Sequence, residues 1–116
     1  MAIRALIPTY KPGGLDARIH PHWKDAEIFT EVEFDENRVH SVKLHELTSD
    51  TLIIDIVKKE KIDVVIALSL STRAVELLDK VGVPVLTGKI QTVKEAIKKF
   101  RSKELYTIKI TKIEQA

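Results

Sequence analysis

The sequence contains no cysteine, and only 5% of its residues are aromatic. Without cysteine there is no disulfide framework, no thiol nucleophile and no thiolate ligand for zinc or an iron–sulfur cluster, so any metal must bind to histidine or carboxylate groups. Few aromatic side chains accompany the lysines, which argues against stacking on single-stranded nucleic acid. The 19 basic and 17 acidic residues nearly cancel, so we expect no strong field that attracts nucleic acid or a membrane surface.

The sequence also lacks an apolar run long enough to cross a bilayer. Its apolar beginning carries Arg4 and Pro8 and has no small-residue cleavage site. We therefore expect a cytoplasmic protein. Asparagine and glutamine are scarce, which is typical of heat-adapted proteins. With 116 residues, 44% of them hydrophobic, the chain fits one domain, residues 1–116, that is stable without disulfides.

The hydrophobic periodicity predicts an α/β fold. Residues 2–8 form the first predicted strand, and residues 28–34 and 39–44 form an antiparallel hairpin. The apolar run 62–68 is typical of a parallel strand buried on both faces. After three strands, helices and strands alternate, which indicates a mixed sheet with helices packed on it. The other predicted elements are a helix capped by Ser49 or Asp50, a helix at 72–81, a short edge strand at 83–87 with Pro84 near its start, a helix opened by the capping box Thr92–Glu95, and an extra C-terminal strand at about 105–113.

Alternation along the predicted hairpin assigns its residues to two faces. Its first strand is expected to be half exposed, with Glu31 and Glu33 on the exposed face. His40 shares the phase of the apolar residues in the second strand and is expected to be packed, whereas His45 has the opposite phase and is expected to be solvated. Two-metal nuclease chemistry needs clustered carboxylates. Because residues 2–8 carry none and the two glutamates lack obvious acidic partners, we expect no such activity.

The best candidate for chemistry is the irregular segment that contains His20, Pro21 and His22. Proline favours an extended conformation at the residue before it, so the two histidines lie on a stretched loop. Side chains two apart on such a loop can converge on one metal ion, and imidazole suits transition metals. The alternative is two surface histidines. Two imidazoles do not complete a site, and further ligands could come from Asp16, His45 or a partner subunit.

A second candidate is the loop after the buried strand, residues 69–73. Ligands of open α/β sheets bind beyond the carboxyl ends of parallel strands, so this loop and the histidine loop are expected to meet at one edge. Ser71 or Thr72 can cap the helix that follows, and Arg73 could pair with a phosphate, a carboxylate or a cluster-bound acid. The alternative is simple capping with an exposed guanidinium. Trp23 is expected to pack at the base of its loop, with a lid over a ligand as the alternative.

Several segments in order resemble one known family. Together they span about residues 3–100, and the series carries the resemblance more than any single motif does. The chain thereby resembles the dinitrogenase iron-molybdenum cofactor biosynthesis family, which includes NifX-like proteins and the C-terminal domain of NifB. The segments are Ile3–Thr9, Gly14–Ile19, His22–Trp23, Val64–Ala67, Thr72–Ala74, Gly82–Gly88 and Thr92–Ala96.

The resemblance implies a ribonuclease H-like fold and a role in holding or handing over a metallocluster precursor. His22 matches the histidine of the family's His-Phe-Gly segment, with Trp23 in the aromatic position. Asp16 and Arg18 match its Asp-x-Arg element, and Arg73 matches the arginine of its Gly-Pro-Arg-Ala helix start. The sequence departs from the family at Lys24, usually glycine, at Asp25, often arginine, and at Leu68–Thr72, which replaces a glycine-rich turn.

The resulting hypothesis is a small, non-catalytic carrier of an iron–sulfur or iron–molybdenum cluster precursor. Its metal ligand is His22, with His20 as a second ligand, and its partner is a metallocluster donor or acceptor protein. A free edge on the C-terminal strand would also permit a homodimer. The alternative is a regulatory or protein-interaction module of the same fold that binds a small anion or a partner and no cluster. The expected cofactor-binding residues are Asp16, Arg18, Ser71, Thr72 and Arg73.

Overall fold

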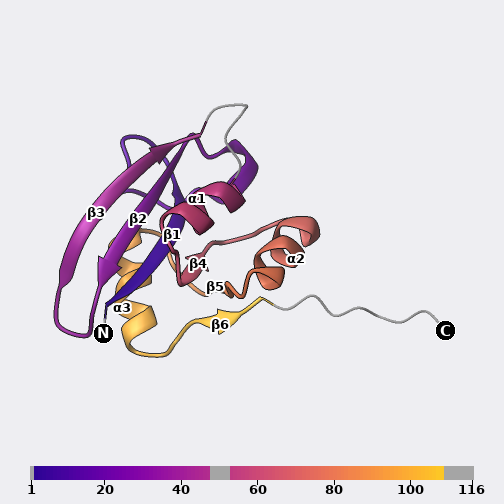
Figure 1. The fold of residues 1–116 in the computed structure, drawn as a ribbon. Helices are drawn as coiled ribbons and strands as arrows, with labels where there is room; N and C mark the ends of the chain where they lie inside the picture. The colour runs from indigo at the N-terminus through magenta and orange to yellow at the C-terminus, as the bar shows by residue number, and fades with distance from the viewer. Residues whose placement is uncertain (1, 48–52, 109–116) are drawn as a thin grey trace.

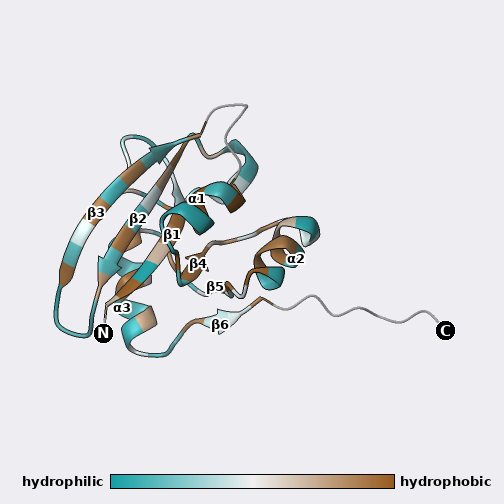
Figure 2. Ribbon diagram, viewed as in Figure 1, coloured by the Kyte–Doolittle hydropathy of each residue, from teal (hydrophilic) through white to brown (hydrophobic). Residues whose placement is uncertain are grey.

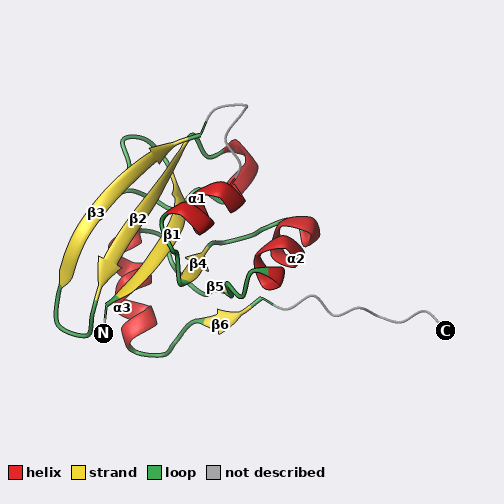
Figure 3. Cartoon of the chain, viewed as in Figure 1, coloured by secondary structure: helices red, strands yellow, loops and turns green. Residues whose placement is uncertain are grey.

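The computed structural model describes residues 2–47 and 53–108 (Figure 1). The elements in these ranges are β1 (Ile3–Thr9), a 3-10 turn η1 (Trp23–Asp25), β2 (Ile28–Phe34), β3 (Val39–Glu46), α1 (Ile53–Lys59), β4 (Val64–Ile66), α2 (Thr72–Lys80), β5 (Val85–Thr87), α3 (Val93–Arg101) and β6 (Tyr106–Thr107) (Figure 3). The strands form one six-stranded sheet in the order β3-β2-β1-β4-β5-β6. β1, β4 and β5 are parallel, and the other neighbours pair antiparallel. This confirms the predicted mixed sheet with helices packed on it.

Two apolar clusters fill the two faces of the sheet. Leu6 of β1 packs in one cluster with Val57 of α1 and Leu78 of α2. Ala5 and Ile7, its neighbours in the strand, point to the opposite face, where α3 covers the second cluster. Figure 1 shows α3 across the sheet from α1. Figure 2 shows hydrophobic residues on the central strands and alternating hydropathy along β3. The chain therefore crosses to the other face of the sheet between β5 and α3.

Side-chain caps define where two helices begin. The Ser71 hydroxyl accepts a hydrogen bond from the amide of Ala74 (3.2 Å) at the start of α2. At the start of α3 the Thr92 hydroxyl accepts from the amide of Glu95 (3.2 Å), as the predicted capping box requires. The Glu95 carboxylate returns to the amide of Gln91 (2.6 Å), one residue before the cap. The predicted cap of α1, Ser49 or Asp50, lies outside the described residues.

The predicted strands are present, and β4 and β5 are shorter than predicted. β4 covers only the centre of the apolar run 62–68. The edge position predicted for residues 83–87 is wrong, because β5 lies between β4 and β6. Pro84 is tolerated because it precedes β5, and its carbonyl still accepts from the amide of Val65 (3.0 Å). Of the C-terminal strand predicted at about 105–113, β6 is described, and residues 109–113 lie outside the described residues.

The two faces of the hairpin were assigned wrongly. β2 is buried along both faces rather than half exposed, and Glu31 is only 2% exposed. In β3 the apolar Val42 and Leu44 are exposed, at 39% and 50%, and His40 on the same face is exposed too. His45, expected to be solvated, is half-buried against Glu31. The alternation is correct, but the charged face of β2 lies on the α1 side of the sheet, whereas the apolar face of β3 remains largely uncovered.

Candidate functional site

The loops that follow β1, β4 and β5 meet at the carboxyl end of the parallel strands. The Ser69 hydroxyl donates to the carbonyl of Pro21 (2.7 Å), which joins the loop after β4 to the histidine loop. The amide of Ile19 donates to the carbonyl of Gln91 (2.8 Å), and Arg18 forms an isolated bridge with Thr92, so the loop after β5 joins them. The predicted meeting of the two candidate loops is therefore observed.

The two histidines differ in how their rings are held. His20 stacks on Tyr10, with ring centroids 4.4 Å apart, and its Nδ1 accepts the amide of His22 (3.0 Å). A neutral ring that accepts at Nδ1 carries its proton on Nε2. For Nε2 of His20 to bind a metal, the bond to the His22 amide must therefore break. The His22 ring is exposed, lies edge-on to that of His20 with centroids 6.3 Å apart, and forms no hydrogen bond within the described residues.

The start of α2 lies beside η1. Ser71 is the N-cap, while Thr72 and Arg73 in the first turn are exposed. Arg73 and Trp23 line one hollow of about 600 Å³ between α2 and η1. Trp23 also packs against the apolar cluster beneath, which confirms its predicted packing role. Arg73 and the tryptophan that follows His22 thus line the same hollow.

Asp16 and Arg18 lie near the start of α3. Asp16 is 90% exposed, and its carboxylate pairs with the ammonium of Lys94 (3.0 Å). Arg18 is exposed and lines a second hollow of about 520 Å³, together with Tyr10 and Pro21. Backbone carbonyls of this same loop accept the first amides of α3, so the positive end of that helix is already occupied.

A cluster that the sequence analysis did not predict lies on the α1 face of the sheet. The His45 ring, through Nε2, pairs with the Glu31 carboxylate (2.8 Å), and the Lys43 ammonium donates to the Glu60 carboxylate (3.0 Å). These two pairs are adjacent, because Glu31 is directly opposite Lys43 in the hairpin register. The expectation that Glu31 lacks an acidic partner is wrong, since Glu60 lies close by. No count along the sequence could have found the cluster, because a β-bulge between Glu33 and Phe34 shifts the hairpin register and Glu60 lies outside the hairpin.

Charge pairing shifts two pKa values in this cluster. The hydrogen bond and the charge of Lys43 lower the pKa of the Glu60 carboxyl below its ordinary value. The hydrogen bond to Glu60, followed by the charges of Glu60 and Glu31, raises the pKa of the Lys43 ammonium. Both groups therefore stay charged through the neutral range.

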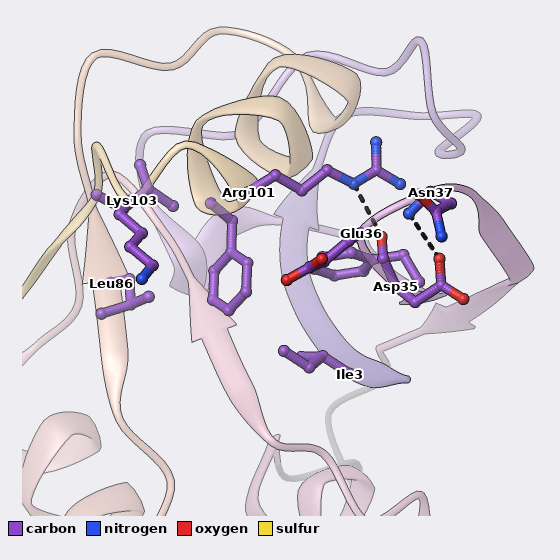
Figure 4. A pocket seen from close by; sticks show the side chains of 10 residues that line it. Ile3, Asp35, Glu36, Asn37, Leu86, Arg101 and Lys103 are labelled. Carbon is purple, nitrogen blue, oxygen red and sulfur yellow. Dashed lines mark hydrogen bonds between the residues drawn. The ribbon is translucent and has the colours of Figure 1, made fainter. Parts of the chain in front are cut away.

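A further hollow of about 660 Å³ lies at the other end of the sheet, where β1 begins at Ile3 (Figure 4). Its polar groups secure the β2–β3 turn. The guanidinium of Arg101 donates through Nε to the carbonyl of Asp35 (2.9 Å). Hydrogen bonds from His40 and from the amides of Asn37 and Arg38 hold the pKa of the Asp35 carboxyl well below its ordinary value. These groups already have partners, so we assign this hollow a structural role.

No helix among the described residues is both long and apolar enough to cross a membrane.

Comparisons with known proteins identify a family and a shared fold. The sequence model of the dinitrogenase iron-molybdenum cofactor family matches residues 4–103. No curated protein matches the chain in sequence. A protein from Methanocaldococcus jannaschii, provisionally named a dinitrogenase, is 19% identical with a TM-score of 0.79, over 96% of this chain and 99% of that one. A Thermotoga protein, provisionally named NifB, is 24% identical with a TM-score of 0.74, over 97% and 98%.

A further relative in structure is the apo form of the orange protein from Desulfovibrio gigas. It is 18% identical with a TM-score of 0.72, over 90% of this chain and 92% of that one. At these identities the solved structures show that the fold is shared, and the family model connects the chain with iron-molybdenum cofactor biosynthesis.

Proposed function

Because the chain belongs to the dinitrogenase iron-molybdenum cofactor family, we propose that it is a small, non-catalytic carrier or accessory protein. Its cargo is an iron–sulfur or iron–molybdenum cluster precursor, exchanged with a metallocluster donor or acceptor protein. The observation that carries the proposal is the exposed imidazole of His22 beside the meeting point of the three loops. The ribonuclease H-like classification, the single domain of residues 1–116 and a homodimer are further parts of this proposal.

His22 is the first ligand in this proposal. Its ring is accessible, and metal binding to it breaks no hydrogen bond between described residues. His20 joins as a second ligand only after its Nδ1 releases the His22 amide. Until then it orients the loop by stacking on Tyr10. A cluster therefore gains its first bond at low cost and its second at the cost of one hydrogen bond, about 1 kcal/mol.

The positive charge for an anionic cluster comes from Arg18 and Arg73. Both guanidinium groups are exposed, and each lines a hollow next to the histidine loop. Ser71 and Thr72 supply the start of α2, a helix end with partial positive charge. Asp16 acts indirectly, because its carboxylate holds the ammonium of Lys94 beside the loop.

Anaerobic loading tests the carrier proposal. Wild type, His22→Ala and His40→Ala are incubated with an iron–sulfur cluster donor, desalted, and assayed for iron and for absorbance of the bound cluster. His40 is the matched control, because it is an exposed histidine beyond the β2–β3 turn. We expect wild type and His40→Ala to retain iron and His22→Ala to lose most of it. Equal, negligible iron in all three proteins would contradict the proposal.

A second candidate function is an anion-binding regulatory module. The observation that favours it is the hollow that Trp23 and Arg73 both line. The two loops beside this hollow carry Lys24 and Leu68–Thr72, where the family usually has glycines. This candidate expects inorganic phosphate to raise the melting temperature of wild type and of Arg38→Ala, but not of Arg73→Ala. Metal salts would leave that temperature unchanged.

A further inference from the structure

We propose that Glu31, His45 and Glu60 form a site for a single divalent transition-metal ion on the α1 face of the sheet. Glu31 comes from β2, His45 from β3 and Glu60 from the turn that follows α1. One ligand atom from each residue lies within 4.8 Å of the other two. This site is separate from the histidine loop and does not depend on the proposed function.

The burial of Glu31 distinguishes this cluster from an ordinary group of surface charges. Its side chain is 2% exposed, and the side chains of Glu60 and His45 are 15% and 19% exposed. Removing a carboxylate from water costs several kcal/mol unless other charges or donors compensate. The described structure compensates it through the 2.8 Å pair with His45 and through the charge of Lys43, which lies opposite Glu31 in the hairpin. A divalent cation would offer the same carboxylate a stronger partner.

The donor set indicates the kind of ion. Two carboxylate oxygens and one imidazole nitrogen suit borderline ions such as Zn²⁺ and Co²⁺, and the absence of sulfur disfavours soft ions. At metal–ligand distances of about 2.1 Å, two ligands of one ion lie roughly 3 to 4 Å apart. The Glu31–His45 pair must open slightly from 2.8 Å, and no separation in the cluster exceeds 4.8 Å, so small side-chain movements suffice. These separations suit the ligands of one ion.

Lys43 occupies part of this site in the metal-free protein. Its ammonium lies 3.0 Å from the Glu60 carboxylate, while its side chain is 56% exposed. It can therefore move into solvent when a cation binds. Arg4 of β1 also lies beside the site. Its guanidinium donates to the carbonyl of Glu60 (2.8 Å) and lies 3.9 Å from the carboxylate of Glu33 in β2, so it stays in place and adds positive charge. Removing the Lys43 charge should therefore tighten metal binding, an effect that a purely structural ion pair would not give.

Cobalt titration tests the site. Purified, chelator-treated protein is titrated with Co²⁺, whose visible absorption reports inner-sphere ligands, and Zn²⁺ is then added in competition. We expect one Co²⁺ per wild-type chain, displaced by Zn²⁺. Binding should weaken at least tenfold in His45→Gln and in Glu60→Gln, and tighten severalfold in Lys43→Met. Glu60→Gln keeps the test valid if His45→Gln unfolds, and circular dichroism confirms folding of each.

The double variant His20→Ala/His22→Ala is the control for the loop. It should bind Co²⁺ as tightly as wild type does. The proposal is overturned if wild type binds no Co²⁺ saturably, or if the loop variant loses binding while Glu60→Gln retains it. Iron loading by His22→Ala does not enter this test, so failure of the metal site and failure of the carrier proposal are distinguishable.

Discussion

The histidine loop and the cluster on the α1 face place similar side chains in opposite settings. His22 is exposed, with a ring that forms no hydrogen bond within the described residues, whereas His45 is half-buried against a carboxylate that is 2% exposed. The loop residues are neighbours in sequence, while Glu31, His45 and Glu60 come from β2, β3 and the turn after α1. An exposed group costs little to remove and is free for a ligand. A buried group stabilises the fold, and any ligand must compete with its present partner.

Removing each imidazole in turn is the most direct test of this difference between His22 and His45. His45→Ala leaves the Glu31 carboxylate buried without its partner, so we expect a loss of about 2 to 3 kcal/mol in the free energy of unfolding. His22→Ala should lose less than about 0.5 kcal/mol, because exposed substitutions rarely cost more. Urea unfolding in the presence of a chelator measures both. Equal small losses would mean that Glu31 gains another partner once His45 is absent.

The loop and the sheet are joined at Gly13, which offers a second way to test the comparison. Its φ is +80°, and a Cβ there would lie 2.7 Å from Leu44 Cδ2 and 2.9 Å from Ile28 Cγ2. Gly13→Ala must therefore strain the backbone and displace β2 or β3 side chains, at a cost of about 1 to 3 kcal/mol.

Gly14→Ala is the matched control for that substitution. Its φ is +98°, but no atom lies within 4 Å of the added Cβ, so it carries the backbone strain alone. Thermal unfolding of both variants separates the clash from the strain. A loss in Gly13→Ala no greater than that in Gly14→Ala would show that the contact with β3 yields easily.

These regions also differ in how far the sequence predicted them. The meeting of the loops followed from the order of strands, because parallel strands bring their carboxyl ends to one edge. Which side chains share a hollow did not follow, since Trp23, rather than His22, borders it together with Arg73. The bond from the His22 amide to His20 depends on a single ring orientation, which residue spacing does not specify.

The hairpin shows why alternation alone is insufficient. Alternation correctly assigned Glu31 and Val32 to opposite faces of the sheet, and likewise Val42 and Lys43, since successive strand residues point to opposite faces. It could not show which face a helix covers. Apolar residues were expected to mark the covered face, but Leu44 is 50% exposed and Glu31 is buried. The position of α1 over the charged face is a tertiary feature, and such contacts override local preference.

A change of pH tests how much the Lys43–Glu60 pair contributes to the stability of the cluster on the α1 face. The pKa of Glu60 is lowered in the folded protein. Its contribution to the free energy of unfolding is therefore fully present above its ordinary pKa of 4.5, and it is lost as the pH falls through the pKa that the group has in the folded protein. Because the pKa of Lys43 is raised, its contribution is present below 10.5 and is lost as the pH rises through the folded value. The pair should therefore stabilise the fold between these limits.

Lys43→Met measures that pair. With a chelator present, its unfolding free energy should fall below that of wild type at pH 7, by less than in His45→Ala, and the difference should shrink at pH 3. Lys80→Met, which removes an exposed lysine of α2, should show no such pH dependence. A difference of the same size at both pH values would indicate that the alkyl chain of Lys43, rather than its charge, contributes.

The smallest effect on stability is expected at the Asp16–Lys94 pair, which isolates the contribution of the loop to ligand binding. Both side chains are largely exposed, at 90% and 70%, and such pairs contribute about 0 to 1 kcal/mol. Asp16→Asn should therefore unfold within about 0.5 kcal/mol of wild type. If Lys94 helps to hold an anionic cluster, the same variant should retain less iron after loading, although its fold is intact. Full retention of iron would mean that the Asp16–Lys94 pair plays no part in holding the cluster. The positive charge for the cargo would then come from Arg18 and Arg73 alone.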